Sequence, residues 1–163
     1  MQVDSKEIKK FSPDTTIDSS ITFGMKKKMK VPGFKDKSSL VPTIDENYIF
    51  DEETTTSILV GFKFNKKVLI QGLHGTGKSS HIEQVASRLN WPCLRINLDG
   101  HISRFDLLGK DSIVLKDNKQ VTTFKEGLLP WAIQNPVALV LDEYDAGRPD
   151  AVSYTHLTLP TMD

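Results

Sequence analysis

The most informative part of the sequence is Gly72-Leu73-His74-Gly75-Thr76-Gly77-Lys78-Ser79. It fits the pattern G-x-x-x-x-G-K-[ST] in full. A short apolar run, residues 68–70, ends just before it, as expected of a buried strand. Residues 78–90 follow it with apolar side chains at helical spacing. A strand, a glycine-rich turn and a helix in this order predict a phosphate-binding loop.

The residue types of this loop suit a nucleotide triphosphate. Glycines let the backbone curl so that successive N–H groups point at phosphate oxygens, and the helix that follows adds its positive dipole end. Lys78 supplies a cation for the β- and γ-phosphates, and the Ser79 hydroxyl is a ligand for Mg²⁺. We therefore predict an ATP site formed by Gly72, Leu73, His74, Gly75, Thr76, Gly77, Lys78, Ser79 and Ser80.

A second motif lies some sixty residues downstream, where the continuous apolar run 137–141 ends in Asp142 and Glu143. A buried parallel strand delivers such carboxylates to the sheet edge at which α/β proteins bind ligands. Asp142 is expected to hold Mg²⁺ directly or through water. Glu143 is then placed to polarise a water against the γ-phosphate, so Glu143 and Lys78 are the predicted catalytic residues.

The segments around these motifs alternate between strand and helix patterns. Alternating apolar residues predict a strand at 94–98, and two short runs flanking 116–119 predict a hairpin over 113–124. Residues 128–133 predict another helix. We expect His81 on the exposed side of the helix after the loop, and Trp91 packed where that helix closes. The pattern predicts an α/β domain with a mostly parallel sheet.

The first fifty residues carry fewer structural signals. Residues 1–30 are polar, with a basic run at Lys26, Lys27, Lys28 and Lys30, and are expected to be a disordered leader. Residues 31–50 predict an irregular or short-stranded extension. Asp51 is a helix N-cap candidate followed by two glutamates, and this helix should stop near Asn65.

Composition limits the partners. The formal net charge is zero, so nothing in it points to nucleic acid or to an anionic membrane. No apolar run approaches the ~20 residues that span a bilayer, and the N-terminus lacks the apolar stretch of a secretory signal. Cys93, the one cysteine, cannot form an internal disulfide. A reduced, cytoplasmic protein is the expectation.

Narrower signatures carry a family resemblance. Residues 30–151 resemble the smaller AAA+ ATPase subunits of aerobic cobaltochelatases, which belong to the chelatase and MoxR-like clade of P-loop NTPases. The stretches that carry the likeness, besides the phosphate loop, are Val31-Pro32-Gly33-Phe34, His81-Ile82-Glu83-Gln84, Leu89-Asn90-Trp91-Pro92-Cys93 and Asp142-Glu143-Tyr144-Asp145-Ala146-Gly147-Arg148-Pro149-Asp150.

The resemblance implies a function and partners. Such subunits form homo-oligomeric AAA+ rings and work with a larger ATPase-like chelatase subunit. ATP hydrolysis helps a third, catalytic subunit, which binds cobalt and the tetrapyrrole, to insert cobalt into a corrin precursor of cobalamin. The expected cofactors are ATP and Mg²⁺, and the hairpin at 113–124 corresponds to the insertion of the chelatase-like clade.

One departure sets limits on these expectations. Residues 51–151 correspond to a partial AAA+ core, whereas 152–163 do not continue the family pattern and are expected to be a foreign or frame-shifted tail. In the family's sheet order, a later strand separates 68–71 from 137–141. Without it the two strands lose their partner or pair directly, so this chain is expected to be inactive alone.

Two other functions stay open at this point. A MoxR-like chaperone or remodelling ATPase shares the fold and the motifs. A small-molecule kinase also uses a phosphate loop and Mg²⁺, but Glu143 argues against it because a kinase places its acceptor where a hydrolase holds the water-activating carboxylate.

Overall fold

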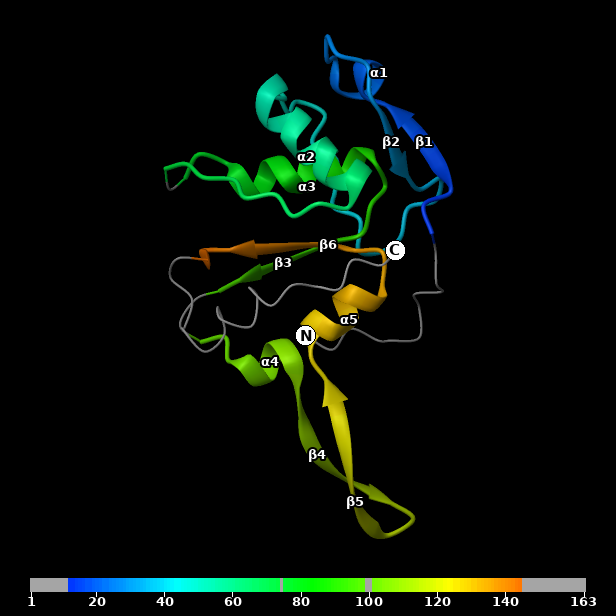
Figure 1. The fold of residues 1–163 in the computed structure, drawn as a ribbon. Coiled ribbons are helices and arrows are strands. Elements are labelled where there is room, and N and C mark those ends of the chain that lie inside the picture. The colour runs from blue at the N-terminus through cyan, green and yellow to red at the C-terminus, as the bar shows by residue number, and fades with distance from the viewer. Residues whose placement is uncertain (1–11, 74, 99–100, 145–163) are drawn as a thin grey trace. The chain divides into compact units, whose positions relative to one another are not determined.

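The computed structural model describes residues 12–73, 75–98 and 101–144. The chain, drawn in Figure 1, divides into two compact units. The first unit contains the chain up to residue 94 together with 136–140, and the second contains 95–135 and the chain from 141 onward. Among the described residues, no helix is long and apolar enough to cross a membrane.

The first unit begins with a small hairpin. Strand β1 (Thr15–Asp18) pairs antiparallel with β2 (Lys30–Gly33), and helix α1 (Ser19–Phe23) lies in the connection between them. The expected disorder of residues 1–30 is therefore wrong for residues 15–30, while residues 1–11 lie outside the described part. The reason is burial: among these mostly polar residues, Phe23 and Met25 are core residues.

Helix α2 (Glu52–Phe64) confirms the sequence-based boundaries. The Asp51 side chain accepts a 2.9 Å hydrogen bond from the Thr54 amide, as an N-cap does. The helix ends at Asn65, which has a left-handed φ of 50° and donates its backbone N–H to Gly61. Its apolar face is buried through Ile58 and Leu59.

Helix α3 (Lys78–Arg88) follows the phosphate loop, as predicted, and packs against α2. The two helices and the N-terminal hairpin share one core, to which α3 and its C-cap contribute Val85 and Leu89. Trp91 packs as expected, with ring centroids 5.1 Å from those of Phe34 and of Phe62. The phosphate loop is therefore followed by a helix that the core holds in place.

His81 is buried, which corrects the expectation that it lies on the exposed side of α3. Only 7% of it is exposed, and its Nε2 lies 2.8 Å from the Thr55 hydroxyl oxygen of α2. The rings of Tyr48 and Phe50 pack edge-on against the imidazole. His81 is four residues before Val85 and therefore shares the core-facing side of the helix.

The strand predicted at 68–70 is absent, since residues 66–73 form no helix or strand. Val68 is 42% exposed and Leu69 75% exposed, so the apolar run is not in the core. A strand needs a neighbouring backbone for its amides, and the described residues supply none that pairs with this segment. The direct pairing of 68–71 with 137–141 is therefore also wrong.

Residues 137–141 pair with a different segment. Strand β6 (Ala138–Asp142) lies beside β3 (Cys93–Asn97). The Ala138 amide donates to the Pro92 carbonyl at 2.8 Å, near the start of both strands, and the Leu98 amide donates to the Asp142 carbonyl at 2.9 Å, near their ends. The pairing is thus parallel, as expected, and both arrows point the same way in Figure 1.

The second unit contains a long hairpin between two short helices. Helix α4 (Arg104–Leu108) leads into β4 (Gly109–Lys116), which pairs antiparallel with β5 (Lys119–Glu126), and α5 (Leu128–Gln134) follows. The predicted hairpin is confirmed and is longer than its apolar runs indicated. Asp117 and Asn118 have positive φ values of 50° and 58° at the two-residue turn, as a type I′ turn requires.

The buried imidazole predicts a pH dependence of stability. Burial lowers the pKa of His81, an effect that the charge of Asp51 partly opposes. The unfolded chain then binds the proton more readily, so stability is full above the unfolded pKa of about 6.5 and falls as pH drops below it. The contribution of one group changes by at most about 1.4 kcal/mol per pH unit.

Thermal unfolding at pH 5.5, 6.5 and 8 measures this effect. The parent chain should lose more stability between pH 8 and 5.5 than His81→Gln does. His101→Gln, which removes an exposed histidine, is the matched control and should follow the parent. Equal pH profiles for the parent and His81→Gln would contradict the prediction.

Candidate nucleotide-binding site

The backbone of the phosphate loop depends on two glycines. Gly75 and Gly77 have φ values of 79° and 77°, in the left-handed region that disfavours side chains. A Cβ added at either residue would meet no atom within 4 Å, so the backbone angle and not crowding is what requires glycine there. Both predicted glycines are thus placed where the loop has to curl, on an exposed surface.

The side chain of Lys78 folds over this loop. Its ammonium donates to the carbonyl oxygens of Gly72 at 2.8 Å and Leu73 at 2.6 Å. The Thr76 hydroxyl also donates to the Leu73 carbonyl, at 2.8 Å. The hydrogen bonds of the ammonium become stronger when an anionic oxygen replaces the neutral carbonyls, because a bond between two charged groups is stronger than one to a neutral acceptor. The lysine is therefore poised at the loop for an anion.

The start of α3 has the features of an anion site. Gly77 is its N-cap and has no side chain to accept from the first amides of the helix. The eleven-residue helix adds the positive end of its dipole at this point. Ser79 is half-buried in the first turn, and His74 lies outside the described residues. These observations fit a bound phosphate group.

Asp142 and Glu143 lie at the C-terminal end of β6, as predicted. One carboxylate oxygen of Asp142 accepts from Arg95 of β3, through Nε at 2.9 Å and through Nη2. The other accepts from the Glu143 amide at 3.0 Å. Asp142 is a half-buried carboxylate whose orientation is fixed by two neighbours, and this donor chemistry suits Mg²⁺.

Glu143 has an unusual backbone. Its φ of 51° is left-handed, which is uncommon for a residue with a long side chain. The residue is exposed, so its carboxylate is accessible to solvent. Such backbone conformations occur often at functional sites. The strand thus ends in a sharp turn at the residue predicted to activate water.

Arg95 contacts a predicted site residue, and the sequence analysis did not identify it. It forms an ion pair with Asp142, and its side chain is 45% exposed. The sequence does contain a sign of its position, because Arg95 is the charged residue between the buried Leu94 and Ile96 in β3. An alternating strand places such a residue on its polar side, but the partner strand could not be identified from spacing alone.

The predicted residues fall into both units. The loop 72–80 belongs to the first unit, and Asp142 and Glu143 belong to the second. Within the described residues, no group of three or more histidine, cysteine, aspartate or glutamate side chains could hold a metal ion. Burial raises the pKa of Cys93 to about 12, so its thiol stays protonated and is not a nucleophile at neutral pH.

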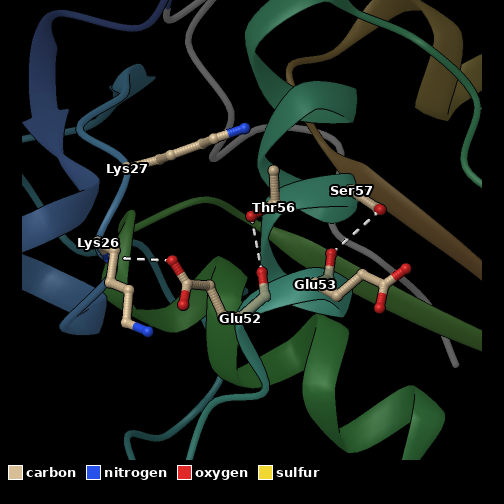
Figure 2. Close-up of a pocket in the computed structure, with 6 residues that line it drawn as sticks. All are labelled: Lys26, Lys27, Glu52, Glu53, Thr56 and Ser57. Carbon is tan, nitrogen blue, oxygen red and sulfur yellow. Dashed lines mark hydrogen bonds between the residues drawn. The ribbon is translucent and has the colours of Figure 1, made fainter.

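A pocket in the first unit is lined by none of the predicted residues. Figure 2 shows it, lined by Lys26, Lys27, Glu52, Glu53, Thr56 and Ser57. The Lys26 amide donates to the Glu52 carboxylate at 3.0 Å. The two hydroxyls donate to carbonyls of their own helix. Its hydroxyls are thus satisfied internally and its charges are of both signs, so we assign it no ligand.

Comparison with known proteins defines the class. The AAA domain family, dynein-related subfamily, matches residues 67–159, which is more than half of the chain. The chain belongs to this family of AAA domains. The α/β fold expected from the sequence is confirmed by this match, and membership implies nucleotide binding.

Three relatives show how similar the chain is to individual proteins. The chain is 59% identical over 140 residues to a protein of Sinorhizobium sp. named aerobic cobaltochelatase subunit CobS, covering 86% of this chain and 42% of that protein. It is 32% identical over 104 residues to midasin of Dictyostelium discoideum, covering 64% of this chain and 2% of midasin. An uncharacterised protein of Staphylococcus saprophyticus is 28% identical over 108 residues, covering 65% of this chain and 41% of that protein. The chain thus spans less than half of the length of each of these relatives.

The loop geometry predicts the effect of removing its cation. Lys78→Ala should weaken nucleotide binding by about 10- to 100-fold, the scale of a charge-assisted hydrogen bond. Titration with a fluorescent ATP analogue measures it. Lys67→Ala, which removes an exposed lysine outside the motif, should bind like the parent. Unchanged affinity in Lys78→Ala would show that the loop is not the site.

Proposed function

We propose that this chain is the nucleotide-binding part of an ATP-hydrolysing cobaltochelatase subunit, and that ATP hydrolysis drives the insertion of cobalt into a corrin precursor of cobalamin. The observation that carries the proposal is the 59% identity to an aerobic cobaltochelatase subunit over 86% of the chain. The left-handed glycines and the folded lysine of the loop support its nucleotide half.

The residues divide into binding and catalytic roles in this proposal. The loop amides of residues 72–80 and the Lys78 ammonium hold the phosphates of ATP. Ser79 and Asp142 hold Mg²⁺, which when bound neutralises charge on the phosphates. Arg95 keeps the Asp142 carboxylate oriented through its ion pair. Glu143 orients the attacking water and accepts its proton.

The proposed partners follow from the same relationship. The chain, as part of a protein of the relatives' length, forms a homo-oligomeric ring and works with a larger ATPase-like subunit and a catalytic subunit that binds cobalt and the tetrapyrrole. The compartment we propose is the cytoplasm. Cobalt is in this scheme a substrate of the partner subunit and not a resident metal of this chain.

A remodelling ATPase that acts on proteins is the second candidate. The observation that favours it is the breadth of the match: the family is the dynein-related subfamily, and midasin is among the relatives. Cobalt insertion is the activity that distinguishes a cobaltochelatase subunit from a remodelling ATPase.

The direct test is reconstitution. A full-length subunit that carries this sequence is combined with the two partner subunits, ATP, Co²⁺ and the corrin precursor. ATP-dependent cobalt insertion that is lost in Lys78→Ala would support the proposal. ATP turnover without any cobalt insertion would support the remodelling ATPase instead.

Glu143 provides a separate prediction. In the same full-length subunit, Glu143→Gln should keep ATP bound but slow its hydrolysis by about 10²-fold or more, because the carboxylate that accepts the proton is lost. Phosphate release at saturating ATP measures the rate, and the affinity for a fluorescent ATP analogue measures binding. Glu46→Gln, at an exposed residue outside the motifs, is the control. Hydrolysis at the parent rate would remove Glu143 from the mechanism.

A further inference from the structure

The hairpin of the second unit sorts its charges by face. Cross-strand partners share a face, and neighbours along a strand alternate. The register pairs Lys110 with Lys125 and Lys116 with Lys119. Every second pair of the register lies on the same face. One face therefore contains four exposed lysines, two hydroxyl residues and two valines. This basic face consists of Lys110, Ser112, Val114, Lys116, Lys119, Val121, Thr123 and Lys125.

The lysines of the basic face repel one another across the strands. Like charges directly opposite destabilise a strand pair. None of the four lysines forms an ion pair within the described residues. Asp106 is one carboxylate that interacts with Lys110: hydrogen bonds from Ser103 are the main cause of its lowered pKa, and the charge of Lys110 adds to that effect. The carboxylates of Asp111 and Glu126 alternate onto the opposite face. The basic face therefore lacks matching negative charge of its own.

The opposite face of the hairpin is apolar and open. Ile113, Leu115 and Phe124 share it and are 70%, 75% and 64% exposed. Exposed apolar side chains gathered on one surface mark sites of protein contact. Figure 1 shows the hairpin extending away from α4 and α5, with its turn at the far end. An isolated two-stranded hairpin is marginally stable in water, so a covering partner would stabilise it.

These features distinguish between two kinds of anionic partner. Nucleic-acid surfaces combine positive charge with aromatic side chains or arginines on which bases stack. The basic face contains neither, since its residues other than lysine are serine, threonine and valine. The apolar face is explained by a protein partner and not by a phosphate backbone. The occupant that the observations favour is an acidic polypeptide.

We propose that the basic face of the β4–β5 hairpin docks a carboxylate-rich segment of a partner protein. The distance along β4 from Lys110 to Lys116 is about 20 Å in extended backbone, so roughly six extended residues of the partner reach both lysine pairs. Each exposed ion pair is weak, and the affinity comes from several of them acting together and falls with salt. This docking does not depend on nucleotide binding.

The test uses the full chain and fluorescein-labelled poly-L-glutamate of about 20 residues. Fluorescence anisotropy at about 20 mM NaCl, a concentration at which charges are weakly screened, measures the affinity. Replacing all four lysines by glutamine (Lys110→Gln, Lys116→Gln, Lys119→Gln, Lys125→Gln) should weaken binding at least about tenfold. The corresponding arginine variant should bind like the parent, because it keeps the charge.

The matched control removes the same charge elsewhere. Lys35→Gln, Lys37→Gln, Lys63→Gln and Lys67→Gln together change four exposed lysines of the first unit. This variant should bind within about twofold of the parent. Thermal unfolding verifies that each variant folds, and the glutamine variant of the basic face should unfold no lower than the parent because it relieves repulsion.

Three results would overturn the proposal. Equal losses in the basic-face and control variants would mean general charge attraction. Loss of binding in the arginine variant would mean that charge is not what recognises the peptide. Tighter binding of a 20-nucleotide oligothymidylate than of polyglutamate, through the same lysines, would make the face a nucleic-acid surface.

Discussion

The conformation of the loop between residues 72 and 79 determines how the proposed nucleotide site is built. Gly75 and Gly77 take left-handed backbone angles that a side chain would disfavour. Those angles turn the chain into α3. Because Gly77 is the N-cap, the helix start has no side-chain cap. The Lys78 side chain folds back onto the loop carbonyls. A helix start without a side-chain cap, beside a cation, is the arrangement that a phosphate group fits.

Much of the fold could be predicted from local patterns. Asp51 and Asn65 were identified as the boundaries of α2 because capping chemistry is local. The strand at 68–70 was wrong for the opposite reason, because an apolar run becomes a strand only beside a partner backbone. The ordered segment 15–30 was missed because its core residues, Phe23 and Met25, are scattered through polar sequence. Non-local pairing thus limits what sequence patterns reveal.

A site can be predicted from the sequence where one motif contains its own chemistry. Spacing alone predicts the loop glycines, Lys78 and the carboxylates at the end of β6 as site residues, and their roles stay predictions. Arg95 was missed because its importance comes from Asp142, a residue 47 positions away in sequence. The burial of His81 likewise depends on Thr55 of another helix. Residues that act through a distant partner require the structure.

Hydrogen–deuterium exchange with and without Mg²⁺ and ATP measures whether the loop binds the nucleotide. Nucleotide should slow exchange at the amides of residues 75–80, because phosphate oxygens accept hydrogen bonds from the loop and the first turn of α3. The amides of β4 and β5 serve as an internal reference and should be unchanged. Protection confined to the pocket around Lys26 and Glu52, or no protection at residues 75–80 at saturating nucleotide, would contradict nucleotide binding by the loop.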